Sequence, residues 1–208
     1  MYLSPARFNR HLNKLGQSFT WRKSSTCPCT NPHSGAARQD CPHCHGKRVI
    51  WAPAVPGSAG VAGQKTQLEW AQFGLYQGGD VVLTIPESSP LYEMGQFDRL
   101  VMLNSTDNFS LPLVRGQNDR IHGHIKKIDR VFWIDGDAIV EGPLPDLAEN
   151  GTLSWSVGGP PAGRQYSVDG TRCSEYFIWG PFPSDRMMHH GARLPRRVVA
   201  RQFDLFGR

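Results

Sequence analysis

The chain has 208 residues, of which 39% are hydrophobic, and its formal net charge is +5. This composition is too apolar for a disordered chain, and no run of about 18 apolar residues is present that could form a membrane-spanning helix. The charge excess is compatible with a nucleic-acid partner, but it is too small to predict one without a clustered basic patch. Because 22 glycines and 16 prolines interrupt the chain, we expect a mainly β protein. Since no membrane-spanning run is present, we also expect a soluble protein that folds in a cytosol and has no membrane partner.

The N-terminal segment, residues 1–20, has the pattern of a short amphipathic helix. After a serine-proline start signal, Phe8, Leu12 and Leu15 recur at the spacing of one helix face. An isolated helix of this length is marginal in water, so its apolar face must pack on the protein's own body or on another subunit. We therefore expect these three residues at an interface.

The segment 21–52 contains the strongest local signal. Cys27-Pro-Cys29 is followed, after 11 residues, by Cys41-Pro-His-Cys44-His-Gly. A Cys-Pro-x-Cys-x-Gly turn is tight enough for both thiolates to reach one ion, and two such pairs complete a tetrahedral zinc site. Since four thiolates fill every position around zinc, this site is predicted to be structural and not catalytic.

Alternatives to four-cysteine zinc ligation remain. The first cysteine pair has one intervening residue where a zinc ribbon has two, so His33, His43 or His45 can replace a cysteine ligand. Free or redox-active cysteines and disulfides are the alternatives to a metal. Cys173 stands alone in an expected strand, where a small core residue is the simpler interpretation.

Residues 53–64 are mostly small residues with prolines and glycines, and we expect them to form a linker. Beyond it, short β signals separated by turn dipeptides predict one β-domain over residues 65–192, built as a small antiparallel barrel or sandwich. The clearest hairpin has Asp135-Gly136 at its centre, for which a type I′ turn is expected. The other expected features are a strand over 68–76 that turns at Gly78-Gly79 into 80–85, a turn at Asn150-Gly151, and a turn at Asp169-Gly170 before a strand over 173–179.

Residues 193–208 form a C-terminal basic arm in which arginines alternate with large apolar residues. A final strand, an arm completed by a partner and a solvated tail are all compatible with this pattern. Arginine beside aromatic residues is a favoured interface composition, and on this basis we expect Arg196, Arg197 and Phe203 at an interface.

Other constellations give weaker signals. His122 and His124 could form half of a metal site on one face of a strand, but no third ligand follows from the spacing, so ordinary histidines are favoured. The chain lacks a phosphate-binding glycine loop, a nucleophile elbow and a zinc-protease helix, which favours a protein that is not an enzyme. A zinc-ribbon nucleic-acid-binding protein is an alternative, in which the basic residues around the cysteines neutralise phosphates: Arg22, Lys23, Arg38, Lys47 and Arg48.

Taken together, several features resemble small structural proteins from the virion modules of tailed bacteriophages. They are the helix with Phe8 and Leu12, the four-cysteine cluster, the β-rich segment Asp80 to Pro86, the stretches 158–163 and 166–168, and the closing Leu194-Pro-Arg-Arg197.

This resemblance implies a non-catalytic neck, head-closure or tail-joining protein that forms a ring, with the four cysteines as zinc ligands. A tail or baseplate component is the alternative within the same group. The implied partners are copies of the chain, portal, adaptor or tail proteins, and packaged DNA in passing contact. The implied location is the virion, after assembly in the cytoplasm of the host bacterium.

Overall fold

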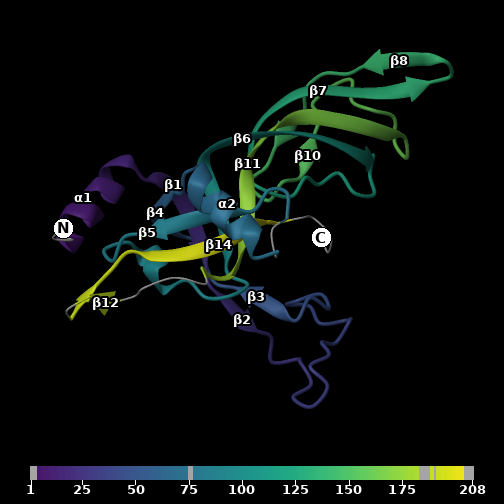
Figure 1. Ribbon diagram of the computed structural model, residues 1–208. Coiled ribbons are helices and arrows are strands. Elements are labelled where there is room, and N and C mark those ends of the chain that lie inside the picture. The colour runs from purple at the N-terminus through teal and green to yellow at the C-terminus, as the bar shows by residue number, and fades with distance from the viewer. Residues whose placement is uncertain (1–3, 75–76, 183–187, 190, 204–208) are drawn as a thin grey trace. The chain divides into compact units, whose positions relative to one another are not determined.

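The computed structural model describes residues 4–74, 77–182, 188–189 and 191–203, and divides the chain into two compact units (Figure 1). The first unit is Met1–Asn104 with Glu175–Arg208, and the second is Ser105–Ser174. The mainly β fold class, the short N-terminal helix and the cysteine cluster are confirmed. The single domain expected over 65–192 is wrong, because residues 105–174 form a separate unit. Two long strands, β6 (Arg99–Val114) and β11 (Gln165–Pro181), have residues in both units.

The remaining elements are short. The first unit contains the α-helices α1 (Pro5–Leu15) and α2 (Gln64–Gln72), the 3-10 helix η1 (Pro90–Glu93), and the strands β1 (Gln17–Arg22), β2 (Ser24–Thr26), β3 (Val49–Trp51), β4 (Val55–Val61), β5 (Val81–Ile85), β12 (Met188–His189), β13 (Ala192–Arg193) and β14 (Arg196–Gln202). The second unit contains the strands β7 (Ile125–Asp135), β8 (Ala138–Glu141), β9 (Asp146–Leu147) and β10 (Leu153–Ser154). Within the described residues, neither α-helix has the length and apolar character needed to cross a membrane.

Six strands of the main sheet form a closed ring. Their order is β14-β5-β4-β1-β6-β11, and β11 pairs again with β14. At the junction of β6 and β11, the Ile178 backbone exchanges hydrogen bonds with Phe97 and Asp98. The main core of the first unit is built from buried residues of these strands and of η1, among them Phe19, Leu83, Leu91, Leu100 and Val198. A closed ring is the barrel form of the antiparallel barrel or sandwich expected from the sequence, but β1 and β4 lie outside the segment 65–192 that was expected to form it.

The prediction of a linker over 53–64 is wrong, because these residues contain β4, which lies between β1 and β5 in the ring. β4 pairs with β1, from Gln17 opposite Ala59 to Trp21 opposite Val55, and Gly60 and Val61 pair with β5. Its small residues are required by close packing: a Cβ atom at Gly57 would lie 2.7 Å from Leu91 Cγ. β1 itself begins at Gln17, inside the segment assigned to the N-terminal helix.

Two further boundaries differ from expectation. The strand predicted over 68–76 is helical at its start, because α2 covers Gln64–Gln72 and buries Trp70 against Val82 and Phe182. The C-terminal arm expected over 193–208 contains β14, which lies between β5 and β11 and buries Val198 and Val199. The arginines of this strand are partly buried, and Arg196 and Arg201 form hydrogen bonds within the first unit. Residues 204–208 lie outside the described part.

The second unit has its own core, which includes Ile128, Val131, Leu153, Tyr166 and Val168. The β7–β8 hairpin is present as predicted, with Asp135 opposite Ala138. Gly136 and Asp137 are therefore the central turn residues, and only Gly136 has a positive φ, of 59°. This is the pattern of a type II′ turn and not of the expected type I′ turn.

The turn expected at Asp169-Gly170 is instead a bulge in the middle of β11, where the register against β7 shifts. A Cβ atom at Gly170 would lie 2.3 Å from the Lys127 carbonyl oxygen. Glycine therefore marks a close approach of two backbones at this position, as it commonly does at a bulge.

Candidate metal centre

The four cysteines predicted as ligands lie in an extension of the first unit that is held by a two-stranded stem. β2 and β3 pair from Ser24 opposite Trp51 to Thr26 opposite Val49. The loop beyond this stem spans 27–48, and it leaves the body next to the labels β2 and β3 in Figure 1. Immediately past the stem, the Cys27 amide donates to the Arg48 carbonyl at 2.8 Å. The two ends of the loop are therefore joined at the point where the first ligand lies.

The four Sγ atoms converge within 4.8 Å of one another, and three of the cysteines are buried. Cys27 Sγ lies 3.8 Å from Cys41 Sγ, and Cys29 Sγ lies 3.5 Å from Cys44 Sγ. A tetrahedral metal with bonds of about 2.3 Å places its sulfur ligands about 3.8 Å apart, whereas a disulfide requires about 2.05 Å. The geometry therefore suits four thiolates around one metal ion.

Backbone amides of the second cysteine pair stabilise a thiolate. The N–H groups of Cys44 and His43 donate to Cys41 Sγ and lower the pKa of that thiol to about 6. Partial burial raises the pKa of the Cys29 thiol to about 12, although the Arg38 amide donates to its sulfur. A bound metal cation would make both cysteines thiolates despite their opposite pKa shifts, because coordination deprotonates a thiol outright.

The turn after Cys41 has the tight geometry that such a site needs. His45 N donates to the Cys41 carbonyl at 2.9 Å, and Lys47 N donates to the Cys44 carbonyl at 2.8 Å. His45 and Gly46 both have positive φ, of 48° and 76°. The backbone thus turns twice within the seven residues 41–47, which directs amides of this turn toward sulfur.

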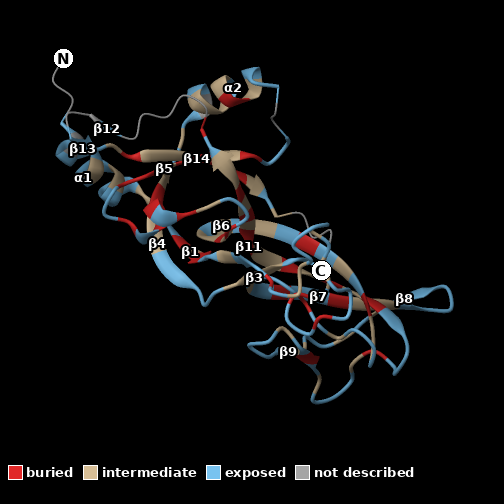
Figure 2. Ribbon diagram, turned by 90° about the horizontal axis from the view of Figure 1, so that it is seen from below, coloured by how far each residue is buried: buried red, intermediate tan, exposed pale blue. Residues whose placement is uncertain are grey.

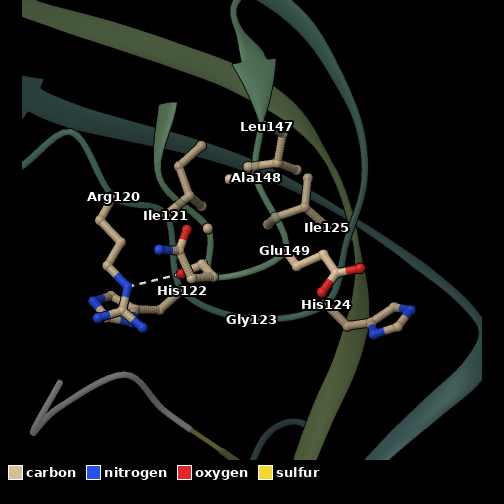
Figure 3. Close-up of a pocket in the computed structure, with 11 residues that line it drawn as sticks. Arg120, Ile121, His122, Gly123, His124, Ile125, Leu147, Ala148 and Glu149 are labelled. Atoms are coloured by element: carbon tan, nitrogen blue, oxygen red, sulfur yellow. Dashed lines mark hydrogen bonds between the residues drawn. The ribbon is translucent and has the colours of Figure 1, made fainter. Parts of the chain in front are cut away.

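The histidines considered as substitute ligands do not belong to the cluster. His33, His43 and His45 are exposed. In the part of the chain that the structure describes, the four cysteines are the one group of three or more His, Cys, Asp or Glu side chains that converge as metal ligands. His122 and His124 form no such site, because β7 begins only at Ile125 and their rings point away from each other (Figure 3).

Basic residues are frequent in the segment that contains the cysteine cluster. Arg22, Lys23, Arg38, Lys47 and Arg48 are all exposed, whereas Asp40, which pairs with Arg38 at 2.9 Å, is the one acidic residue between 21 and 52. A divalent metal with four thiolates carries a formal net charge of about −2. These cations therefore offset the negative charge of a loaded centre, an electrostatic role that does not require a nucleic acid.

A buried carboxylate anchors the stem to the body, and sequence reasoning missed it. Asp98 is 1% exposed and accepts hydrogen bonds from Trp21 Nε1 at 2.7 Å, Ser24 N at 2.7 Å, Ser24 Oγ at 2.8 Å and Gly95 N at 2.9 Å. Because its donors come from β1, from the first residue of β2 and from its own loop, no sequence spacing reveals this role.

An aromatic cluster supports the other strand of the stem. Trp51 Nε1 donates to the Phe97 carbonyl at 3.3 Å, and the Trp51 ring meets Phe203 edge-on with a centroid distance of 6.3 Å. The Arg99 guanidinium lies 4.3 Å from the centroid of Phe203 and forms an ion pair with Glu175. Phe203, which was expected at an interface, therefore packs inside its own unit.

Of the other residues expected at an interface, some also contact their own unit and some are exposed. Arg196 donates to the carbonyls of Tyr92 and Met94, and Arg197 lies over the Phe182 ring at 4.5 Å, so both are engaged within the unit. In α1, Leu12 packs toward β4, where a Cβ atom at Gly60 would lie 2.8 Å from its Cδ2 atom. Phe8 and Leu15 remain 44% and 61% exposed.

The second unit contains a depression of about 450 Å³ between residues 120–125 and 147–151 (Figure 3). Arg120 Nε donates to the Asn150 carbonyl across it at 2.9 Å. Most of the residues that line it are exposed, and the cluster of metal ligands lies in the other unit.

Comparison of the sequence with known protein families and with curated proteins found no match.

Proposed function

We propose that this protein is a non-enzymatic structural component of a tailed-phage virion, in which a zinc ion bound by Cys27, Cys29, Cys41 and Cys44 fixes a projecting extension. The observation that carries the proposal is the convergence of four sulfur atoms at tetrahedral spacing. A centre of this kind has no open coordination position, so its contribution is to folding and not to chemistry.

Zinc is the metal that this donor set favours. Tetrahedral sulfur sites select zinc or iron, and a histidine-free cluster of thiolates is a common structural zinc site. The loop 27–48 has few apolar residues of its own, and its buried cluster is made of the cysteines with Ala37 and Ile50. Metal binding is therefore the main source of stability available to this loop.

The placement at a head-to-tail junction rests on the resemblance to phage neck, head-closure and tail-joining proteins. In that role copies of the chain form a ring and contact portal, adaptor or tail proteins, with packaged DNA passing through. The exposed apolar residues of α1 support an assembly role, because exposed apolar groups next to charged residues are typical of protein interfaces.

Two measurements test the proposal. Elemental analysis of protein purified without chelator is expected to find about one equivalent of zinc. An iron-loaded protein would instead show charge-transfer absorption, and less than a tenth of an equivalent of any metal would contradict the centre.

The second measurement tests the virion. Particles from cells that carry the gene are sedimented through a density gradient, and the protein is detected with an antibody. We expect it in the particle fraction. Recovery in the soluble fraction only, or binding to free DNA that weakens steeply with salt, would contradict a virion role and favour the nucleic-acid-binding alternative.

A further inference from the structure

One third of the chain's acidic residues lie within residues 129–150, a region that we call the acidic surface. It contains six carboxylates and a single arginine, and all six carboxylates are exposed: Asp129, Asp135, Asp137, Glu141, Asp146 and Glu149. Because the whole chain has a net charge of +5, this local excess of negative charge runs against the overall balance.

The acidic surface also exposes large apolar side chains. Ile134 and Ile139 lie directly opposite each other in the β7–β8 hairpin, and they are 62% and 64% exposed. Leu144 and Leu147 are exposed in the segment that follows. Figure 2 shows the end of this hairpin in the colour of exposed residues. An exposed apolar pair on a hairpin among exposed acids is characteristic of a surface that binds a basic, apolar partner.

Helix α1 has the complementary composition. It contains no acidic residue, and its lysine and arginine side chains are all exposed: Arg7, Arg10 and Lys14. Arg7, Arg10 and Lys14 recur at helical spacing and form one stripe, beside which Phe8 and Leu15 are exposed. Leu12 faces β4, so the helix is attached to its own unit through one side and presents a basic and apolar side to solvent. We call this side the basic helix face.

We propose that the basic helix face of one copy binds the acidic surface of a second copy. This inference rests on the proposed function, since it names the contact by which copies assemble. The two surfaces carry opposite charges, and each offers a pair of exposed large apolar residues. Because they are different surfaces, the contact is head-to-tail, and its repetition gives a closed ring or a filament.

Three of the carboxylates are available for this contact. Asp129, Asp135 and Glu141 already pair with Lys127, Arg164 and Arg130 within the chain. Asp137, Asp146 and Glu149 form no ion pair in the described part of the chain. They are therefore the carboxylates whose reversal tests the contact without breaking an internal one.

A charge-reversal experiment with two variants of the full-length protein tests the proposal. The helix variant carries Arg7→Glu, Arg10→Glu and Lys14→Glu, and the acidic-surface variant carries Asp137→Lys, Asp146→Lys and Glu149→Lys. Sedimentation velocity of the wild type is expected to show oligomers that weaken as salt increases. Each variant alone then presents like charges at the contact, and its self-association should weaken by at least about tenfold.

Mixing the two variants in equal amounts is the decisive step. The unaltered helix of one variant can bind the unaltered acidic surface of the other. The two reversed surfaces also carry opposite charges, so the mixture should recover oligomers. Lys65→Glu, which reverses an exposed cation on α2, is the matched control and should associate like the wild type. Circular dichroism melts establish that each variant is folded.

Three results would overturn the inference: a wild type that stays monomeric at all concentrations, variants that associate as the wild type does, or a mixture that does not recover. Each leaves the virion proposal to its own test, because co-sedimentation with particles does not depend on which surfaces join the copies. Where a reversed variant does not fold, neutral Arg7→Gln, Arg10→Gln and Lys14→Gln should reduce association by a smaller factor, and unchanged association in that variant also overturns the inference.

Discussion

Asp98 shows how much of this fold depends on single buried polar residues. Its two carboxylate oxygens satisfy four donors from Trp21, Ser24 and Gly95, which join β1, the stem and the loop before β6. Hydrogen bonds to a charged group contribute more than neutral ones, and a buried donor that loses its partner pays its desolvation cost in full. One side chain therefore determines where the extension begins.

We predict that Asp98→Ala lowers the free energy of unfolding by about 3 kcal/mol, because it leaves the Trp21 indole and two backbone amides without acceptors. Urea denaturation measures this change. Asp98→Asn keeps one acceptor oxygen and should cost less, while Asp137→Ala, at an exposed site, should cost almost nothing. Equal midpoints for all three variants would show that the Asp98 network contributes little to stability.

A second carboxylate makes the stability of the first unit depend on pH. Burial opposes ionisation of Asp80, but hydrogen bonds from Arg201, Trp70 and the Gln77 amide outweigh it and hold the pKa of this carboxyl below its ordinary value. The folded protein therefore binds this proton less readily than the unfolded chain does. The contribution is fully present above the unfolded pKa of about 3.9 and is lost as pH falls through the lower folded value.

Asp80→Asn is accordingly expected to destabilise the protein by about 3 kcal/mol at pH 7, because it leaves the Arg201 guanidinium buried without its counter-charge. The same substitution should reduce the loss of stability between pH 5 and pH 2. Denaturation midpoints of both proteins across this range provide the measurement. Parallel pH profiles for the two proteins would show that other carboxylates account for acid unfolding.

At the scale of elements, the β7–β8 hairpin depends on one backbone conformation. Gly136 has a φ of 59°, in the region that β-branched residues avoid, and its neighbour Asp137 is outside that region. We predict that Gly136→Val costs about 1 to 3 kcal/mol and that Asp137→Val costs much less. Thermal melts of the two variants distinguish strain from a general effect of valine at the turn. The same midpoint for both would contradict the type II′ assignment.

The elements also explain which parts of the fold could be predicted from sequence. The cysteine site was predictable because its ligands are set by local spacing, and the β7–β8 hairpin because its turn chemistry is local. β4 was not, since its glycines look like a linker until Leu91 and Leu12 are known to occupy the space above them. Gly170 is likewise a turn signal in sequence and a bulge in structure.

Helix α2 and the C-terminal strand β14 were not predicted from the sequence, for a different reason. The segment 68–76 reads as a short strand before the turn at Gly78-Gly79, whereas α2 packs Trp70 against Val82 and Phe182. β14 reads as a charged arm because the sequence does not show what its arginines bind. In the structure they bind backbone carbonyls and a buried carboxylate. The partners of these groups are far away in sequence, so no local pattern reveals them.

The extension is an element whose stability should depend on its metal. Cys44→Ser, or treatment with a strong chelator, is expected to abolish metal binding and to expose the loop 27–48 to trypsin at Arg38, Lys47 and Arg48. The body should keep its melting temperature within a few degrees, because both of its large cores consist of residues outside this loop. Cys173→Ser, at a buried cysteine of β11, is the control that should retain the metal.

This prediction separates a local role of the metal from a global one. Loss of the cooperative melt on metal removal would show that the centre stabilises the whole first unit. Unchanged protease resistance in the metal-free protein would show that the loop folds without it.

At the scale of the whole molecule, the two ends of the chain have opposite roles although both read as detachable arms in the sequence. α1 attaches to its unit through Leu12 and leaves Phe8 and Leu15 exposed. β14 closes the ring of strands, and because successive strand residues face opposite sides, Val198 enters the main core and Val199 enters the core beneath α2.

Truncations from the two ends should therefore give opposite results. Deletion of residues 1–15 is expected to leave a cooperatively melting body whose self-association is weakened at least about tenfold, since it removes the basic helix face and no residue of the two large cores. Deletion of 193–208 removes β14, which opens the ring and takes buried residues from two cores, so we expect no cooperative melt and loss of the near-ultraviolet circular dichroism signal. A folded protein after the second deletion would contradict the closed ring. Loss of folding after the first would show that α1 belongs to the core and is not free to bind another copy.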